Sequence, residues 1–577
     1  MKDWREEYAY WLGSGALTAE EQAELEALKG NDKEIEDRFY APLAFGTAGL
    51  RGVMGMGLNR MNVYIIRQAT QAFAEVILGE GPEAAEKGVV IGFDCRNHGR
   101  EFAREAACVM AANGVHVLLF ENMQPTPELS FAIRRYGATA GINVTASHNP
   151  KEYNGYKVYW SDGAQLPPEQ ADAVAAKMAA SDLFTAPLSG DFDDYVNQGC
   201  IGFLGKECDE AFLEQVMAQR IDPEAIPAVA DDFEVVYTPF HGCGRVLVPE
   251  ALRRAGLKHL FTVEEQMVPD GNFSTVPSPN PEYPESFAMA VELAGKVDCE
   301  LIIGTDPDSD RVAAMVRRGE GYIPLTGNQM GVLLLDYIIS AKKRSGTLTE
   351  KAAALTTIVS TGMARRVCEY NGVHFDETFT GFKFIAEKLA EYAEAGSYEY
   401  LMGFEESIGY MMGDYVRDKD AVTASLLITE MGAYWFRQGK TLADAMDSLY
   451  EKYGHYRERT ENLYMYGVDG LREMRELMER LRANPPADCN GLAVKRVRDY
   501  LTGELLSPTG EKLGETPMKG SNVLYLELED GSNLVIRPSG TEPKIKMYVL
   551  ARGGSAAEAE EKRERIAAFA LSLADKT

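Results

Sequence analysis

The sequence predicts an α/β protein with three mixed α/β domains followed by a C-terminal α+β domain. The chain has 577 residues, 45% of them hydrophobic, which at about 150 residues per domain corresponds to about four domains. Strand-like and helix-like segments alternate along most of the chain, as they do in α/β folds. Near the C-terminus this alternation gives way to a hairpin pattern.

The first β-α-β unit is expected between residues 89 and 120. Residues 89–93 and 115–120 are apolar runs typical of strands, and residues 104–113 between them have the periodicity of a helix that Gly114 ends. Similar strand signals recur at residues 234–237, 301–303, 354–359 and 400–402. The pattern therefore favours several α/β domains in succession.

The last part of the chain has a different pattern. Residues 523–528 and 534–536 are apolar runs joined by Glu-Asp-Gly-Ser, which predicts a β-hairpin, and an Ala- and Glu-rich helix follows from about residue 556. We expect domain boundaries that give residues 1–205, 206–325, 326–455 and 456–577. Boundaries are the least certain part of such a division.

Composition limits the partners and the location. A net charge of −29 makes nucleic acids and anionic membranes poor partners, so an anionic substrate needs a local basic pocket. No apolar run approaches the roughly 20 residues of a membrane span, and the first residues lack a signal-peptide pattern. We expect a cytoplasmic protein whose eight cysteines, without a Cys-x-x-Cys pair, are reduced. Cys243 and His241, near a strand end, receive no role.

A serine lies on an expected turn at residues 145–150, Thr-Ala-Ser-His-Asn-Pro. The segment follows the strand-like residues 140–144 and ends at a proline, which places the hydroxyl of Ser147 on a loop. His148 and Lys157 could supply proton transfer and positive charge to such a nucleophile. Taken alone, the motif could equally be a surface loop.

Three aspartates alternate after the apolar residues 301–303. Asp306, Asp308 and Asp310 can converge on one cation, and oxygen-only ligands favour Mg²⁺ or Ca²⁺ over zinc. An EF-hand is excluded because the sixth and twelfth positions are Arg311 and Arg317 rather than glycine and glutamate. A hard-cation site at a strand end is the interpretation that remains.

Two further segments carry groups suited to a sugar phosphate. Residues 537–546 combine an arginine, hydroxyls, a glycine and lysines, which suit a phosphate dianion. Glu405 and Ser407 follow another apolar run and offer acceptors for sugar hydroxyls. Each segment alone is weak evidence.

The serine, aspartate, sugar and phosphate segments, in this order, resemble the α-D-phosphohexomutase superfamily along nearly the whole chain. Residues 45–52 are similar to its N-terminal active-site segment, in which an arginine, here Arg51, faces a phosphoserine. Residues 380–383 are similar to its further substrate loop. The resemblance implies a four-domain phosphohexomutase-like fold around a central cleft.

Within the superfamily, residues 405–409 and 417–420 resemble the phosphoglucomutase branch. Enzymes of dual phosphomannomutase and phosphoglucomutase specificity carry a histidine soon after the sugar-loop serine, whereas this chain has Ile408-Gly409-Tyr410. Ala48 stands where many members have serine, and relatives that act on phosphopentoses or make glucose 1,6-bisphosphate share this feature. Phosphopentomutase, phosphomannomutase and glucose 1,6-bisphosphate synthase therefore stay open as alternatives.

The resemblance implies a Mg²⁺-dependent enzyme that interconverts glucose 1-phosphate and glucose 6-phosphate, with glucose 1,6-bisphosphate as activator and intermediate. The catalytic residues would be Ser147, which carries the phosphoryl group, His148, Lys157 and Arg51. The metal ligands would be Asp306, Asp308, Asp310 and a phosphoryl oxygen on Ser147. Substrate would contact Thr380, Gly381, Glu405, Ser407, Arg417, Lys419 and Arg311, and its second phosphate Arg537, Ser539, Gly540, Thr541 and Lys546.

Two other classes use part of this set. A serine phosphatase could share the nucleophile and the metal but has no need for a distant second phosphate cradle, whereas a mutase does. A sugar-phosphate sensor could keep the cradle but would not need serine, lysine and three aspartates together. The sequence fixes neither the preference for hexose or pentose, nor the oligomeric state, nor the direction of flux.

Overall fold

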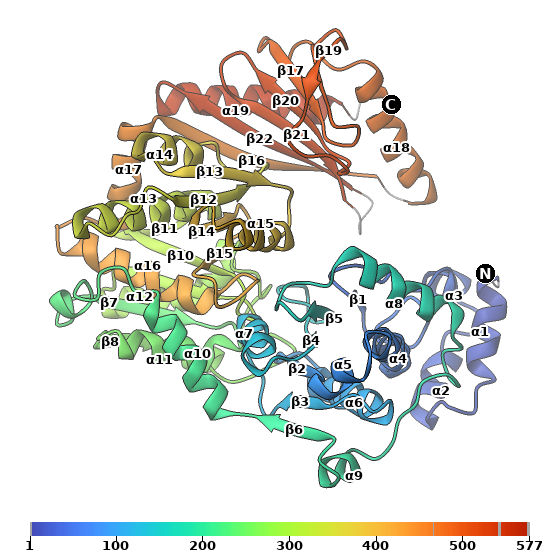
Figure 1. The fold of residues 1–577 in the computed structure, drawn as a ribbon. Coiled ribbons are helices and arrows are strands. Elements are labelled where there is room, and N and C mark those ends of the chain that lie inside the picture. Colours follow the sequence, from blue (N-terminus) through green and yellow to red (C-terminus); the bar gives the residue numbers. More distant parts are fainter. Residues whose placement is uncertain (1–2, 466, 540–543, 574–577) are drawn as a thin grey trace. The chain divides into compact units, whose positions relative to one another are not determined.

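The computed structural model describes residues 3–465, 467–539 and 544–573, and the chain divides into two compact units (Figure 1). Unit 1 comprises Met1–Leu325 and Gly409–Thr441, and unit 2 comprises Thr326–Ile408 and Leu442–Thr577. Each unit contains two β-sheet layers, and each is described here by itself. Among the described residues, no helix combines the length and apolar character needed to cross a membrane.

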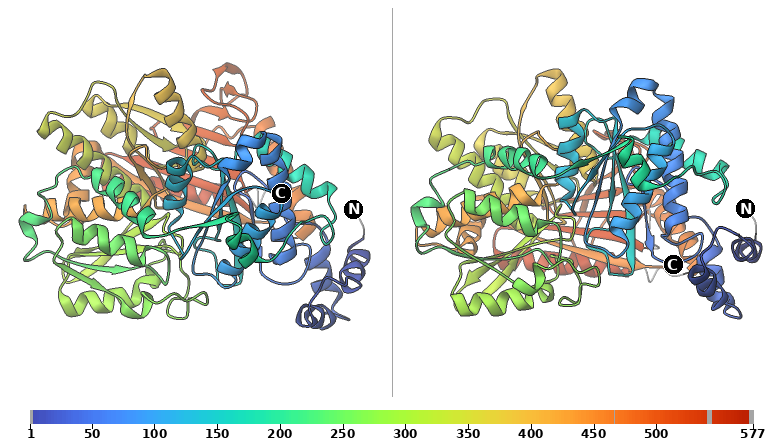
Figure 2. Two further views of the ribbon diagram at one scale, coloured as in Figure 1. Left: turned by 60° about the horizontal axis from the view of Figure 1, so that its bottom comes forward. Right: turned by 90° about the horizontal axis from the view of Figure 1, so that it is seen from below.

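Unit 1 begins with three short helices for which the sequence analysis made no prediction. They are α1 (Trp4–Leu12), α2 (Ala19–Glu26) and α3 (Asp32–Phe39), drawn in dark blue in Figure 2. Trp11 is fully buried and packs edge-on against Phe39, Tyr64 and Phe184. These aromatic contacts anchor the helices on α4 (Val63–Gly79) and on the segment after α8 (Pro168–Ala180).

The first sheet of unit 1 has the strand order β1-β5-β4-β2-β3-β6. Its strands are β1 (Leu50–Val53), β2 (Val89–Phe93), β3 (Val117–Phe120), β4 (Ala140–Val144), β5 (Tyr153–Trp160) and β6 (Ile201–Leu204). β2, β3, β4 and β6 pair in parallel, while β5 runs antiparallel to β4 and β1. The turn from β4 into β5 therefore contains Ser147 and brings Lys157 opposite Asn143.

The helices around this sheet are α4, α5 (Pro82–Lys87), α6 (Gly99–Ala112), α7 (Thr126–Tyr136), α8 and α9 (Phe192–Asn197). α4 packs against α6 and α8, and α7 packs on β2 and β4. The predicted β-α-β unit at residues 89–120 is present, although α6 begins at Gly99, before the predicted residue 104. His98, directly before α6, has a left-handed backbone conformation, so the helix begins after it. The apolar periodicity of the sequence becomes clear only several residues later.

The second sheet of unit 1 has the order β11-β10-β9-β7-β8. β7 (Glu234–Thr238), β8 (His259–Thr262) and β9 (Leu301–Thr305) are parallel, and β10 (Val312–Arg318) and β11 (Gly321–Leu325) continue it antiparallel. The three aspartates lie in the turn from β9 to β10. The surrounding elements are α10 (Lys206–Ala218), α11 (Gly244–Arg254), α12 (Ala288–Val297), β15 (Gly409–Met412) and α16 (Ala421–Phe436).

Unit 2 contains a parallel arrangement in which β12 (Ala352–Thr357) pairs with β13 (His374–Thr378) on one side and β14 (Glu399–Glu405) on the other. Its helices are α13 (Gly327–Ser345), α14 (Met363–Asn371), α15 (Phe382–Ala395) and α17 (Leu442–Tyr453). Thr326 begins α13 with a reciprocal capping box to Gln329. The sugar-loop residues follow β14 directly.

The C-terminal sheet of unit 2 has the order β16-β22-β21-β20-β17-β18-β19 and is antiparallel. Its elements are β16 (His455–Tyr464), α18 (Gly467–Ala483), β17 (Val494–Asp499), β18 (Glu504–Leu506), β19 (Lys512–Glu515), β20 (Leu524–Leu528), β21 (Asn533–Pro538), β22 (Lys544–Gly553) and α19 (Ala556–Ser572). The pairing of β20 with β21 confirms the predicted hairpin, and α19 confirms the predicted closing helix.

The two sheets of unit 2 contact each other through a cluster of apolar side chains. Ile358 and Val359, directly after β12, pack with Val535, Tyr548 and other residues on one face of the C-terminal sheet. The opposite face of that sheet packs with α19. This contact fixes the strands that carry Arg537 and Lys546 relative to the sheet that carries the sugar loop.

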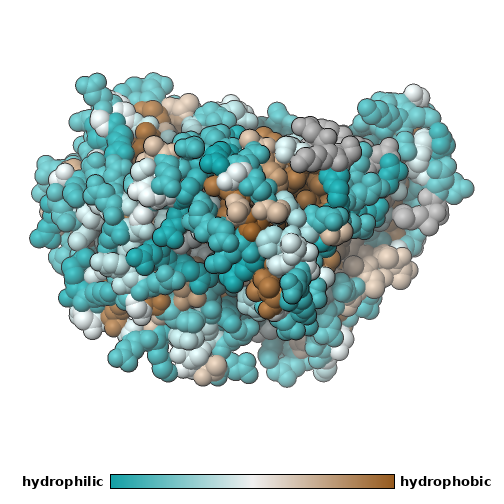
Figure 3. All heavy atoms as spheres, turned by 90° about the horizontal axis from the view of Figure 1, so that it is seen from above, coloured by the Kyte–Doolittle hydropathy of each residue, from teal (hydrophilic) through white to brown (hydrophobic). Residues whose placement is uncertain are grey.

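The surface agrees with the composition. On the face drawn in Figure 3, hydrophilic side chains predominate and apolar residues form small separate patches. All eight cysteines lie in described residues and are free thiols.

Candidate active site

Ser147 occupies a strained position at the end of β4. Its backbone φ of 52° lies in the left-handed region, which costs a residue with a Cβ roughly 1–2 kcal/mol. Two hydrogen bonds hold it there, because its N–H donates to Thr145 Oγ1 at 2.9 Å and its carbonyl accepts from Arg96 Nη2 at 2.6 Å. In this conformation the hydroxyl donates to Asp306 Oδ2 at 2.6 Å.

Arg96 organises the serine loop from behind. Its buried guanidinium donates to four backbone carbonyls of the loop, those of Ser147, Asn149, Pro150 and Tyr153, at 2.5–2.9 Å. Asp94 accepts from Thr145 Oγ1 at 2.5 Å, and burial raises the pKa of its carboxyl to about 6 against the influence of Arg96. Sequence reasoning missed both residues, although their position directly after the strand at 89–93 was a usable signal.

His148 and Arg51 both make contacts within the serine loop. His148 Nδ1 is 3.1 Å from Ser147 Oγ, and Arg51 Nη1 donates to Asn149 Oδ1 at 2.9 Å. Burial, followed by the charges of Arg311 and Arg51, lowers the pKa of His148 well below its usual value. The imidazole is therefore neutral at pH 7.

The three aspartates are buried, and one carboxylate oxygen from each lies within 4.8 Å of those of the other two. Asp306 Oδ1 accepts from the backbone N–H groups of Asp310 and Arg311, at 3.1 and 3.0 Å. Burial and the two neighbouring carboxylates raise the pKa of Asp306 well above its usual value. Three acids held this close repel one another strongly unless a cation lies between them.

Two lysines contact Asp308 and Asp310. Lys157 Nζ donates to Asp308 Oδ2 at 2.6 Å and to Asp310 Oδ2 at 3.1 Å, and Lys419 Nζ lies 3.3 Å from Asp310 Oδ2. Burial acts to lower the pKa of Lys157, but Asp308 and Asp310 outweigh it and raise the pKa above its ordinary value. Lys157 is therefore a protonated ammonium group.

The remaining oxygens suit a metal ion. Within the part of the chain that the structure describes, Oδ1 of Asp308 and Oδ1 of Asp310 are buried and have no hydrogen-bond partner. Buried oxygen atoms normally have a partner, so these two unpaired carboxylate oxygens fit a role as cation ligands. The donor set consists only of carboxylate oxygens and fits a hard divalent cation.

Arg311 and Arg417 both lie in unit 1, and Arg311 lies close to Asp310. Arg311 Nε is 3.7 Å from Asp310 Oδ1, and its backbone forms a bridge with Gly409. The guanidinium of Arg417 donates to the carbonyls of Val416 and Asp414, and its backbone N–H donates to Ser130 Oγ at 2.9 Å. Thus Ser147, His148, Lys157, Arg51, the aspartates, Arg311, Arg417 and Lys419 all lie in unit 1.

Unit 2 brings two of the predicted substrate segments together. Glu405 is the last residue of β14, and its Oε1 accepts from the N–H of Gly381 at 2.7 Å. Gly381 has a φ of 120°, which a residue with a side chain rarely adopts, and it begins α15. Thr380 beside it has a buried hydroxyl without a hydrogen-bond partner among the described residues. Ser407 lies in the turn that follows Glu405 and β14.

The phosphate segment lies on neighbouring strands of the same unit. Arg537 on β21 is directly opposite Lys546 on β22, and the N–H of Ser539 donates to the carbonyl of Lys544 at 2.8 Å. Gly540 and Thr541, between them, lie outside the described residues.

Tyr548 links the two segments of unit 2 and was missed by sequence reasoning. Burial, and then the charge of Glu406, raise the pKa of its phenol above the usual value, while Arg537 acts in the opposite direction. Tyr548 therefore lies close enough to both Glu406 and Arg537 for their charges to act on it. The alternation of Lys546 and Tyr548 along a strand was a signal, since alternate residues share a face.

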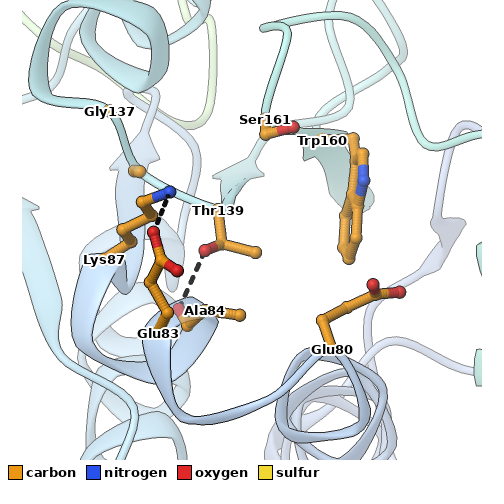
Figure 4. A pocket seen from close by; sticks show the side chains of 9 residues that line it. Glu80, Glu83, Ala84, Lys87, Gly137, Thr139, Trp160 and Ser161 are labelled. Atoms are coloured by element: carbon orange, nitrogen blue, oxygen red, sulfur yellow. Dashed lines mark hydrogen bonds and ion pairs between the residues drawn. The ribbon is translucent and has the colours of Figure 1, made fainter.

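Two hollows in the surface of unit 1 do not coincide with the predicted residues. One, of about 440 Å³, is lined by Trp160 on one side and by the ion pair of Lys87 and Glu83 on the other (Figure 4). A second hollow of about 570 Å³ lies at the start of α6. The serine and aspartate loops therefore define the candidate active site better than these depressions do.

A strained serine hydrogen-bonded to a carboxylate cluster, within α/β domains of this kind, fits the phosphohexomutase class of protein. Three models of the phosphoglucomutase/phosphomannomutase family, for its alpha/beta/alpha domains I, II and III, match residues 42–184, 210–319 and 326–453. Together they cover more than half of the chain. The chain belongs to this family, in the phosphoglucomutase branch of the phosphohexomutase superfamily.

Individual relatives agree. The chain is 36% identical to phosphoglucomutases of Staphylococcus aureus strains MRSA252 and USA300, over 90% of this chain and 91% of each relative. The solved structure of Paramecium parafusin, a phosphoglucomutase, matches 93% of this chain and 95% of that chain with a TM-score of 0.65 and 18% identity. A Burkholderia thailandensis family member matches 92% and 97%, with a TM-score of 0.64 and 18% identity. These structures establish the likeness of fold.

Proposed function

We propose that this chain is a phosphoglucomutase that interconverts glucose 1-phosphate and glucose 6-phosphate through a phosphoserine and glucose 1,6-bisphosphate. The observation that carries the proposal is the 2.6 Å hydrogen bond from Ser147 Oγ to Asp306 within a buried triad of aspartates. A phosphoryl group on this oxygen would lie against the metal site. The phosphoglucomutase relatives support the choice of substrate.

The proposed metal ion is Mg²⁺, held by Asp306, Asp308, Asp310 and a phosphoryl oxygen on Ser147. A bound divalent cation would neutralise charge on the phosphoryl oxygens during transfer. The chain's own contribution is positioning, because Arg96 fixes the serine loop and the backbone N–H groups of Asp310 and Arg311 fix Asp306.

Proton transfer is assigned to Lys157, with His148 and Arg51 beside the phosphoserine. The protonated ammonium of Lys157 could donate to a sugar oxygen as its bond to phosphorus breaks. The neutral ring of His148 could accept the proton of a hydroxyl that attacks phosphorus. Arg51 would add positive charge to the phosphoryl oxygens.

Substrate binding is assigned to residues of both units. Glu405 and Ser407, supported by Thr380 and Gly381, would bind ring hydroxyls, and Arg311, Arg417 and Lys419 would add positive charge. Arg537, Ser539, Gly540, Thr541 and Lys546 would hold the phosphate that does not react. Glucose 1,6-bisphosphate would turn between two binding modes. The four-domain division at residues 205, 325 and 455 and a cytoplasmic location belong to the same proposal.

A coupled assay tests the function. The purified protein, primed with glucose 1,6-bisphosphate and MgCl₂, should convert glucose 1-phosphate to glucose 6-phosphate faster than it acts on mannose 1-phosphate or ribose 1-phosphate. Faster turnover of one of those two substrates would instead identify a phosphomannomutase or phosphopentomutase. Net release of inorganic phosphate would indicate a phosphatase, and accumulation of bisphosphate without isomerised product would indicate a synthase.

A further inference from the structure

A threonine at the start of α7 grips the middle aspartate of the triad. Thr126 is fully buried, its backbone N–H donates to the carbonyl of Asp308 at 2.8 Å, and its hydroxyl donates to Asp308 Oδ2 at 2.6 Å. Thr126 follows β3 of the first sheet of unit 1, whereas Asp308 lies in the turn after β9 of the second sheet. One residue therefore fixes both the backbone and the side chain of Asp308.

Asn143 sets the direction of the threonine hydroxyl. It lies on β4, and its Nδ2 donates to Thr126 Oγ1 at 2.8 Å. A hydroxyl has one proton, so an oxygen that accepts from Asn143 directs its own proton to the other neighbour, which is Asp308. The strand that leads into the serine loop thus orients the group that holds the aspartate loop.

The two carboxylate oxygens of Asp308 have different surroundings. Oδ2 accepts from Thr126 Oγ1 and from Lys157 Nζ, both at 2.6 Å. Oδ1 is buried without a hydrogen-bond partner among the described residues. Because two donors engage the same oxygen, the carboxylate is held with Oδ1 available to the cation. Thr126 does this as a neutral group, whereas Lys157 adds a charge that opposes cation binding.

We infer that Thr126, oriented by Asn143, is a positioning residue of the metal site and contributes to its affinity for a divalent cation. The inference rests on the proposed metal role of Asp306, Asp308 and Asp310. Removing an outer partner of a metal ligand typically weakens metal affinity by about 10–100-fold. Thr126 would act through Asp308, which it bonds with both its hydroxyl and its backbone N–H.

Metal binding by the protein alone tests the inference. Free Mn²⁺ is measured by electron paramagnetic resonance during titration of metal-free protein, for wild type, Thr126→Val and Thr126→Ser. Valine keeps the shape and removes the hydroxyl, so we expect Mn²⁺ affinity to fall about 10-fold or more. Serine keeps the hydroxyl and should stay within a few-fold of wild type. Asp308→Asn serves as the positive control.

A matched control separates positioning from a general loss of stability. Thr429 is also fully buried in unit 1, and its hydroxyl bonds the carbonyl of Ser425 within α16. Thr429→Val should bind Mn²⁺ like wild type even where its Tm with EDTA falls as much as that of Thr126→Val. If Thr126→Val does not fold, Asn143→Leu, which frees the hydroxyl to turn, should weaken Mn²⁺ binding in its place.

Failures of the inference and of the proposed function give different results. The proposed metal site is wrong if the wild-type protein does not bind Mn²⁺, or if Asp308→Asn does not abolish the binding. If wild type binds Mn²⁺ and Thr126→Val, or Asn143→Leu where the valine variant does not fold, binds it with equal affinity, the metal site stands and the inference is overturned. Equal weakening in Thr429→Val would also overturn it.

Discussion

At the scale of residues, backbone strain marks the proposed loops. Ser147, Ser309 and Ile408 have φ values of 52°, 55° and 54° and lie in the serine, aspartate and sugar segments. Residues with a side chain seldom adopt this conformation, and it persists where surrounding bonds enforce it. At Ser147 the enforcing bonds come from Arg96 and Thr145. The strain therefore aims a hydroxyl, and its position agrees with a role as nucleophile.

Ser147→Ala should remove the phosphorylated form and reduce mutase turnover by at least about 1,000-fold, because the acceptor oxygen is lost. The fold should persist, since the bonds that hold the loop involve backbone atoms of residue 147. Intact-mass and peptide mass spectrometry measure the phosphate, and circular dichroism checks the fold. A phosphate mapped to another residue in the wild type would contradict the assignment.

Sequence could indicate Ser147 and the three aspartates because each lies within a short motif after an apolar run. Arg96 and Thr126 lie in other segments, and their contacts with these loops depend on how parallel strands align. The position of Arg96 after a predicted strand was a signal of a functional residue, but the sequence around neither residue shows which loop it contacts. The motifs could therefore be predicted, whereas the residues that hold them in place could not.

At the scale of elements, α7 connects the aspartate loop to a buried acid. Thr126 begins the helix, and Glu128, in its first turn, is fully buried near Asp209. Burial, and then the charge of Asp209, raise the pKa of Glu128 well above its usual value. The protonated form is thus favoured in the folded state, while an unfolded chain ionises near pH 4.3.

Glu128→Gln should therefore stabilise the protein increasingly as pH rises. Because the pKa of Glu128 is higher in the folded than in the unfolded protein, its contribution to the free energy of unfolding is fully present below about pH 4.3. As the pH rises toward the folded pKa, this contribution is lost at about 1.4 kcal/mol per pH unit. Glutamine has no proton to lose, so the Tm of the variant relative to wild type should rise between pH 5 and pH 7.5. Scanning calorimetry measures both proteins, with the exposed Glu169→Gln as control. A Tm difference independent of pH would contradict the assigned pKa direction.

At the scale of the whole molecule, the residues proposed to carry out the reaction and those proposed to hold the second phosphate belong to different units. The serine and aspartate loops belong to unit 1, while the sugar and phosphate segments belong to unit 2. The alternation of strands and helices predicted the α/β class, and two apolar runs joined by a turn sequence near the C-terminus predicted the hairpin. The strand order of each sheet was beyond local pattern, because it depends on pairings between segments far apart in the chain, such as β16 with β22.

The separation of the two groups allows their roles to be distinguished in one variant. Arg537 lies in unit 2 opposite Lys546, whereas the three aspartates belong to unit 1, so Arg537→Ala should remove the proposed phosphate contact and leave the aspartate cluster intact. Loss of a charge-assisted bidentate contact should cost about 2 kcal/mol, or roughly 30-fold in kcat/KM for glucose 1-phosphate. Mn²⁺ affinity should stay at the wild-type value. Lys495→Ala, an exposed cation on β17 of the same sheet, controls for loss of charge. A kcat/KM at the wild-type value in Arg537→Ala would exclude a mechanism in which a second phosphate is held. It would favour the serine phosphatase instead.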